Sequence, residues 1–582
     1  MAAKENRQTA EAAGWGSDII ADLLRALELP YAVIVPGASF RGLHDSIVNR
    51  LGNHDPKLVT CLHENHAVSI ADGYSRVTET PLLVILHSNV GLMNGAMGIY
   101  NAWCDRRPML ILGATGPVDA HQRRPWIDWV HTSKDQGAMV RNFVKWDDQP
   151  ASAEAAIESI LRANQITRTA PQAPVYICLD AHMQEAALDR RVDIPSVERF
   201  KPPAPIGVDQ RTLTSIGEAL RNAKHPLLLA GRVSRRMEDW NKRIALADAY
   251  GLTVLSSANN PPAFPVSHPL HILPPAGDKP TKEESDLITQ SDLILSLDWL
   301  DLAGFLRARG AGSQTQTPTT AKIIHCSLDG LLANGWSMDH QALAAIDIAV
   351  TAHPDALVRD LMEIAPKSTK PTTNQAHWQA SLTAPRASKR FDLLQLAAGV
   401  TTWSEKKNDV SFARLPIGWP TKACLFNHPL DFLGKDGGGT VGTGPAHTVG
   451  VALALKGSKR SVVGIIGDGD FLMGMNALWT ASNQDLSMLL IIANNQSYYN
   501  DEVHQERVAI ERGRPVENKG IGQKLENPAV DLNAIAAAQG FETAPTVHSL
   551  EELEAALLQA SKVLDNGGRY FINARIAPGY AS

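Results

Sequence analysis

Short apolar runs alternate with helix-length amphipathic segments along almost the whole chain, and this alternation restricts the fold more than any other feature. Each run has roughly four to six apolar residues, the usual length of a buried strand. The clearest are YAVIVPG, PLLVILHS, HPLLLAG, SDLILSLD, SVVGIIGDGD and LSMLLIIANN. Buried strands separated by helical segments predict an α/β fold whose parallel sheets carry helices on both faces.

Two polar segments that contain proline interrupt the alternation, RFKPPAPIGVDQ and APKSTKPTTNQAH. Such segments are typical of linkers. A chain of 582 residues is also too long for a single hydrophobic core. We therefore expect three α/β domains, each with a doubly wound parallel sheet, at residues 1–190, 205–365 and 390–582.

Charge and composition exclude several classes of protein. The net charge of −6 is spread along the sequence without a basic block, which argues against a nucleic-acid partner. No run of about twenty apolar residues occurs, so we expect no membrane span, and MAAKENRQTAEAAGWGSD lacks the apolar core of a secretory signal. The five cysteines are far apart and lack metal-type spacing. These features predict a multidomain, cytoplasmic protein of enzyme size.

The segment GDGDFLMGMNALWTASNQDLSMLLIIANN ends one apolar run in an acid between two glycines and the next in two asparagines. A right-handed crossover would place Asp468 and Asn495 at the carboxyl ends of neighbouring strands, where such folds bind ligands. Gly467 and Gly469 would let a ligand approach the backbone closely. A structural turn would explain the glycines of GDG alone, and a capping role would explain the two asparagines alone. Together, the oxygen ligands favour Mg²⁺ or Ca²⁺ held with phosphate and water.

GDG followed by NN at this separation resembles the signature of the thiamine diphosphate (ThDP) enzymes. The resemblance implies that Asp468, Asn495 and the backbone carbonyl of Ser497 hold the Mg²⁺ ion that carries the cofactor's diphosphate. The neighbouring cofactor contacts would be Gly467, Gly469, Asp470 and Asn494.

Two further motifs follow the order of this family. TCLHENHAVSIADGYSR places Glu64 before ADGY, and the resemblance implies that its carboxylate binds the aminopyrimidine ring of ThDP. In GGGTVGTGPAHTVGVALAL, Val441 matches the apolar residue that holds the cofactor bent. The alternative for Glu64 is a solvated helix glutamate, and the alternative for the glycine-rich segment is a structural turn. The resemblance covers the whole chain as pyrimidine-binding, central and diphosphate-binding domains, in the order of the pyruvate oxidase, acetolactate synthase and 2-oxo acid decarboxylase group.

LHSNVGLMNGAMGIYNAW, FVKWDDQPAS and FPVSHP resemble the benzoylformate decarboxylase branch. This implies that His87 donates or accepts a proton above the cofactor and that Asn94 lies at the pyrimidine side. Ser39 in PGASFRGLHD would meet the substrate carboxylate, with Ala38 competing for the same alignment, and a capping role is the alternative for His87. That branch has a second catalytic histidine in its central domain, whereas LILSLDWLDLAGFLRARG contains none. RPWIDWVHTSKDQGAMVRN matches no known role.

The implied activity is ThDP- and Mg²⁺-dependent, non-oxidative decarboxylation of a 2-oxo acid to an aldehyde. Three alternatives remain: a carboligase of acetolactate synthase type, a lyase of 2-hydroxyacyl or oxalyl thioesters, and a ThDP-binding paralogue without catalysis. Glu64 and the metal ligands lie in separate predicted domains, so the cofactor must bridge an interface. In relatives that interface lies between subunits, so the resemblance implies a homodimer or homotetramer.

Overall fold

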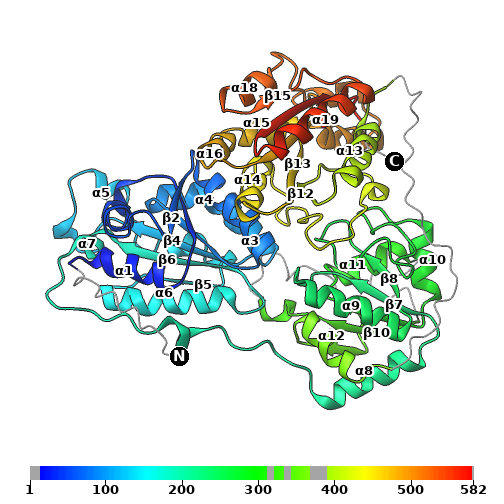
Figure 1. The fold of residues 1–582 in the computed structure, drawn as a ribbon, viewed down its shortest axis with the longest axis horizontal. Coiled ribbons are helices and arrows are strands. Elements are labelled where there is room, and N and C mark those ends of the chain that lie inside the picture. The colour runs from blue at the N-terminus through cyan, green and yellow to red at the C-terminus, as the bar shows by residue number, and fades with distance from the viewer. Residues whose placement is uncertain (1–13, 311–319, 333–342, 367–389, 580–582) are drawn as a thin grey trace. The chain divides into compact units, whose positions relative to one another are not determined.

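The computed structural model in Figure 1 describes residues 14–310, 320–332, 343–366 and 390–579. The predicted linker at 365–377 lies outside the described residues beyond Pro366, and so does the end of the chain from 580 to 582. The chain divides into two compact units, Met1–Ser75 with Thr80–Pro203, and Arg76–Glu79 with Ala204–Ser582. These units contain three all-parallel sheets, which confirms the predicted α/β fold class.

The first sheet lies in the first unit and has the strand order β2-β1-β3-β4-β6-β5. Its strands are β1 (Tyr31–Ile34), β2 (Lys57–Thr60), β3 (Leu82–Leu86), β4 (Met109–Thr115), β5 (Trp146–Asp148) and β6 (Pro174–Asp180). Its helices are α1 (Gly16–Ala26), α2 (Arg41–Asp45), α3 (Glu64–Thr78), α4 (Ser88–Cys104), α5 (Ile127–Val130), α6 (Ala153–Arg168) and α7 (Ala181–Glu185). Apolar residues of α1 and α6 join alternate residues of the central strands in one core, so these two helices cover the same face.

The second sheet has the order β11-β10-β9-β7-β8. Its strands are β7 (Pro226–Ala230), β8 (Thr253–Ser256), β9 (Leu293–Leu297), β10 (Lys322–Cys326) and β11 (Ile348–Val350). The helices are α8 (Gln210–Asn222), α9 (Met237–Tyr250), α10 (Lys282–Gln290), α11 (Leu302–Arg309) and α12 (Pro354–Glu363). Separate cores lie on its two faces, as expected for a doubly wound sheet.

The third sheet has the order β12-β13-β14-β16-β15. Its strands are β12 (Val410–Arg414), β13 (Ser461–Gly467), β14 (Met488–Asn494), β15 (Glu542–Thr543) and β16 (Arg569–Arg575). The helices are α13 (Leu393–Lys407), α14 (Gly444–Ala454), α15 (Asp468–Gly474), α16 (Ala477–Asn483), α17 (Tyr499–Glu511), α18 (Leu532–Ala538) and α19 (Leu550–Asp565). Among the described helices none combines the length and the apolar character that a membrane span requires.

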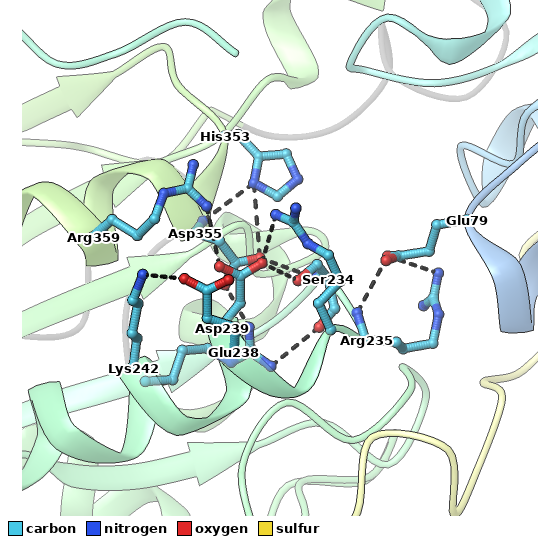
Figure 2. Close-up of polar contacts among 11 residues, drawn as sticks. Glu79, Ser234, Arg235, Glu238, Asp239, Lys242, His353, Asp355 and Arg359 are labelled. Atoms are coloured by element: carbon cyan, nitrogen blue, oxygen red, sulfur yellow. Dashed lines mark hydrogen bonds and ion pairs between the residues drawn. The ribbon is translucent and has the colours of Figure 1, made fainter. Parts of the chain in front are cut away.

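A buried ion pair joins α9 to α12 beside the second sheet (Figure 2). Arg243 and Asp355 form this pair, and both side chains are 0 % exposed. Asp355 Oδ2 also accepts a hydrogen bond from the amide of Ser234 at 2.8 Å. Arg243 donates to the carbonyls of Ala263, at 2.9 Å, and Ser234, at 3.1 Å. Because each charge has several partners, the pair fixes two helices and the loop after β7 in one arrangement.

Removing one charge of this pair is expected to destabilise the second sheet strongly. Asp355→Leu should cost about 3–5 kcal/mol, because Arg243 would stay buried without its partner, and the double variant Arg243→Leu/Asp355→Leu should cost less than the single one. Hydrogen exchange at the amides of β7 and β9 would measure the loss of stability in the single and the double variant. Glu238→Ala is the matched control, because its pair with Lys242 lies at the surface and should contribute less than about 1 kcal/mol. Equal losses in the single and double variants would contradict this account.

Candidate active site

The two turns that the sequence singles out lie side by side at the carboxyl edge of the third sheet. β13 and β14 are parallel neighbours, with Gly467 opposite Ala493. Asp468 is the first residue of α15, directly after β13, and Asn494 is the last residue of β14. The predicted placement of both turns at the ends of neighbouring strands is therefore confirmed.

A cavity of about 560 Å³ opens at this edge. Most of the predicted cofactor and metal residues of this region line it: Val441, Gly467, Asp468, Gly469, Asp470, Asn495 and Ser497. A Cβ added to Gly467 would meet no atom within 4 Å, so this glycine leaves open space in the wall. The cavity therefore has room for a ligand beside the GDG turn.

Asp468 has a buried carboxylate with one unused oxygen. The residue is 4 % exposed, and its Oδ1 accepts a hydrogen bond from the amide of Gly469 at 3.1 Å. Oδ2 is buried and has no hydrogen-bond partner. Burial raises the pKa of Asp468 to about 6, although the amides of Gly469, Gln496 and Ser497 oppose the rise. A buried carboxylate oxygen without a partner is costly, and a cation would relieve that cost.

The loop after β14 is held by its own side chains. Asn495 Oδ1 accepts from the amide of Ser497 at 3.0 Å. Asn494 Oδ1 accepts from the amide of Gln496 at 3.1 Å, and Asn494 Nδ2 donates to Asn573 Oδ1 at 2.9 Å. The side chain of Asn494 is thus engaged within the fold, and the residue does not line the cavity. Its contact with the cofactor stays a prediction.

Sequence reasoning missed two supports of this loop. Arg575, which lies opposite Asn494 in the register of β14 and β16, donates to the side-chain oxygen of Gln496. Ser497 Oγ donates to the buried carboxylate of Glu502, which also pairs with Lys524 at 2.7 Å. The signal for Arg575 was available, because the apolar run RYFINARI places this charge at the end of a strand, where the carboxyl edge binds ligands.

The glycine-rich segment before α14 is tied to the GDG turn. Asp470 Oδ1 accepts from the amides of Gly442 at 2.7 Å and Gly444 at 3.1 Å. Gly442 has φ +94°, a left-handed conformation that favours glycine. Val441, 44 % exposed, lies next to this position on the cavity wall. Asp470 therefore sets the position of the segment that carries Val441, a role that the sequence did not indicate.

These residues fit a metal–diphosphate group. Asp468, Asn495 and the carbonyl of Ser497 are oxygen donors of the kind that Mg²⁺ prefers. In the part of the chain that the structure describes, no group of three or more His, Cys, Asp or Glu side chains could hold a metal. A metal beside Asp468 would therefore need further ligands, and phosphate oxygens and water would supply them.

The first unit contains the second half of the predicted site. Glu64 is the first residue of α3 and is 8 % exposed. Its Oε2 accepts from Nδ2 of Asn94, an exposed residue on α4, at 3.1 Å. The structure thus brings together two predicted residues that are 30 positions apart. A buried carboxylate with one amide partner keeps a free oxygen for a ligand nitrogen.

His87 lies at the start of α4, and its ring contacts Ser39. Ser39 Oγ is 2.8 Å from His87 Nδ1, and the Ser39 amide also points at this nitrogen, at 3.5 Å. Two donors on Nδ1 favour the tautomer with hydrogen on Nε2. Burial lowers the pKa of His87, His131 and Arg124 lower it further, and Glu64 raises it. His87 is therefore neutral at neutral pH.

His131 lies against His87, a contact that the sequence did not predict. The ring centroids are 4.7 Å apart and the ring planes meet at 76°. His131 belongs to RPWIDWVHTSKDQGAMVRN, which follows β4. The available signal was this position, since loops after parallel strands lie at the ligand-binding edge.

Three family models match the chain in order. The N-terminal TPP binding domain of thiamine pyrophosphate enzymes matches residues 14–139, the central domain of these enzymes matches 213–345, and their C-terminal TPP binding domain matches 417–574. This chain belongs to the thiamine pyrophosphate enzymes. Thiamine pyrophosphate (TPP) is the compound called ThDP above, so the family predicted from the GDG and NN motifs is confirmed.

Named relatives of this ThDP enzyme fall into two groups. It is 26 % identical over 519 residues to benzoylformate decarboxylase of Pseudomonas aeruginosa, covering 87 % of this chain and 90 % of the relative. It is 24 % identical over 567 residues to the acetolactate synthase large subunit of Haemophilus influenzae, covering 94 % and 92 %. Both identities are low, so they establish the family and leave the reaction open.

Solved structures share the fold along the whole length. Benzoylformate decarboxylase from Polynucleobacter necessarius superimposes with a TM-score of 0.79 at 21 % identity, covering 98 % of this ThDP enzyme and 100 % of that chain. The ThDP-dependent 4-hydroxybenzoylformate decarboxylase of Rhodococcus jostii gives 0.79 at 21 % identity, covering 97 % and 100 %.

Proposed function

We propose that this enzyme removes CO₂ from a 2-oxo acid without oxidation and releases an aldehyde, with ThDP and Mg²⁺ as cofactors. The observation that carries the proposal is a buried carboxylate, Glu64, in the same part of the first unit as a neutral histidine, His87. A carboxylate can hold a proton at a ring nitrogen, and an imidazole can deliver the proton of one nitrogen to carbon or oxygen while its other nitrogen takes one up. The match to benzoylformate decarboxylase supports the same assignment.

Each site residue has a role in this proposal. Asp468, Asn495 and the carbonyl of Ser497 would hold Mg²⁺, while Val441 supports the bent cofactor. When bound, ThDP supplies the electron sink that lets the carboxylate leave as CO₂. Glu64, which accepts a hydrogen bond from Asn94, would bind the aminopyrimidine nitrogen of ThDP.

His87 would act in the proton step of this proposal. Its Nδ1 accepts from Ser39, so Nε2 carries the hydrogen that completes the aldehyde. The predicted contact of Ser39 with the substrate carboxylate is also part of the proposal. The hydroxyl then has two partners, because it can donate to His87 and still accept a hydrogen bond.

The proposal includes assembly and location. Glu64 and Asp468 belong to separate compact units, which supports a homodimer or homotetramer in which subunits share the cofactor. The five cysteines all lie in the described ranges and form no disulfide there, which supports the proposed cytoplasmic location.

A carboligase of the acetolactate synthase type is the second candidate, because such a synthase matches 94 % of the chain. Ligation of two carbonyl compounds needs a pocket that withholds protons from the intermediate. His87 works against this requirement, so decarboxylation is the better-supported reaction.

Product analysis tests the proposed function. The protein with ThDP and Mg²⁺ would be given benzoylformate, pyruvate and branched-chain 2-oxo acids, with and without an acceptor aldehyde. We expect CO₂ and one aldehyde in equal amounts from at least one acid. A hydroxy ketone that forms only with acceptor would identify a carboligase. No CO₂ from any acid, with ThDP demonstrably bound, would refute the decarboxylase.

A further inference from the structure

The position of His131 is fixed by contacts on both sides of its loop. The amide of Gly116, directly after β4, donates to the carbonyl of His131 at 3.3 Å. Asn89 Nδ2 on α4 donates to the carbonyl of Val130 at 3.2 Å. Asn89 lies on the helix that His87 precedes, and β4 pairs with β3, the strand that His87 follows, so the two rings are positioned by neighbouring elements.

The loop before His131 is also closed on itself. Arg124 donates to Asp128 through its guanidinium at 2.8 Å and through its amide at 2.7 Å. Thr132 Oγ1 donates to the Asp128 carbonyl at 2.5 Å. A Cβ on Gly116 would lie 2.3 Å from Thr132 Oγ1, so only glycine fits between β4 and this turn. The contact between the two histidines therefore results from a specific local structure.

The His87 ring is also confined by the segment that carries Ser39. A Cβ on Gly37 would lie 2.2 Å from His87 Cγ, so the ring fills the space that this glycine leaves. Ser39 holds Nδ1 from the same segment. The imidazole therefore contacts the backbone at Gly37 and a second ring, that of His131, at an interplanar angle of 76°.

We propose that His131 is a positioning residue for His87, which fixes the orientation of the His87 ring and keeps it neutral. The charged groups near His87 are Glu64 from α3, Arg124 from the loop, and His131. The ring centroids are 4.7 Å apart, so a positive charge on His131 disfavours a proton on His87. Of the two neighbouring side chains that lower the pKa of His87, His131 has a larger effect than Arg124.

This inference extends the proposed function, because the neutral state matters for the proton step assigned to His87. As Nε2 gives its hydrogen to the substrate, Nδ1 can take up the proton of the Ser39 hydroxyl, 2.8 Å away, and solvent replaces that proton. The ring then ends the step neutral, which requires that Nδ1 be unprotonated at the start. Without His131, the same ring would be protonated over a wider range of acid pH and could turn within its pocket.

Titration of His87 in the apoprotein tests the inference without any need for activity. The full chain, carrying ¹³C-labelled histidine, would be followed by NMR from pH 5 to 8, and the His87 signal assigned by its absence in His87→Gln. In His131→Phe, which keeps an aromatic ring but removes the charge, we expect the pKa of His87 to rise toward its ordinary value of 6.5. His131→Gln should give a rise in the same direction. His121→Phe, an exposed histidine of the same loop, should give no change.

The acid limb of kcat/KM provides the second measurement. We expect this limb to move to higher pH in His131→Phe, with KM little changed. At a fixed pH below the pKa of His87, kcat/KM should be about tenfold lower for each pH unit by which that pKa rises. An unchanged His87 titration in both His131 variants would overturn the inference even if aldehyde formation is found. Absence of CO₂ from every acid would refute the proposed function and leave the titration result standing.

Discussion

Asp468→Asn is expected to abolish the stabilisation by Mg²⁺ and ThDP while leaving the apoprotein at least as stable as the natural chain. Folding raises the pKa of this carboxyl from 3.8 to about 6. The folded state therefore holds the proton more tightly than the unfolded state, so stability falls as pH rises through this window. Above this pH window the buried carboxylate is charged and destabilises the folded state fully. Asparagine carries no charge and avoids this destabilisation. The same substitution removes the charge that would hold the metal.

Thermal unfolding at neutral pH, with and without Mg²⁺ and ThDP, measures both effects. At a cofactor concentration of about 100 times Kd the natural chain should gain roughly 2.7 kcal/mol, and Asp468→Asn should gain nothing. The gain of the natural chain should fade below about pH 6, where Asp468 takes up its proton. Asp485→Asn, a substitution of a side chain that is 85 % exposed, should keep the full gain. An undiminished cofactor gain in Asp468→Asn would contradict the metal site.

Glu64→Gln is expected to remove the catalytic activity while the cofactor still binds. Glutamine keeps the size of the buried side chain and can still accept from Asn94, but it cannot hold a proton at the aminopyrimidine nitrogen. Loss of a positioned acid–base group lowers kcat by about 10²–10⁴-fold. The measurements are aldehyde formation and the rate of proton exchange at C2 of bound ThDP, and both should fall.

The thermal shift with Mg²⁺ and ThDP serves as the internal control for this variant. It should stay close to that of the natural chain, because the metal ligands lie in the other unit. Glu158→Gln on α6, whose side chain is 62 % exposed, should leave kcat unchanged. Proton exchange at the natural rate in Glu64→Gln would remove the role assigned to this carboxylate.

The apolar central strands were predictable from the sequence, but four edge strands were not. β3, β9 and β14 are apolar at nearly every position because helices cover both faces of the sheet. β5, β11, β12 and β15 were missed, and each lies at the edge of its sheet. β5 reads WDD and β15 reads ET. These two edge strands pair on one side only and lack the apolar signal that marks a strand. β12 reads VSFAR, where a serine and an arginine break the apolar run although most of the strand is buried.

The site was predictable where a residue's role follows from its position at a strand end. Asp468 and Asn495 follow predicted strands, and the right-handed crossover brings them to one edge. His131 was missed because its role depends on how one irregular loop closes through Asp128 and Thr132. The cofactor contact of Asp470 stays a prediction, and the sequence did not indicate that its carboxylate accepts two amides of the glycine-rich segment. Contacts of this kind depend on tertiary geometry, which strand periodicity does not encode.

The buried pair of Arg243 and Asp355 has a consequence for how this protein can change over generations. The two residues are 112 positions apart, yet replacing either one alone would leave an unpaired charge in the interior. A lineage can therefore leave this arrangement only through a second change at the partner position, or through an intermediate of low stability. Among descendants of this chain, the arginine and the aspartate should be inherited or lost together.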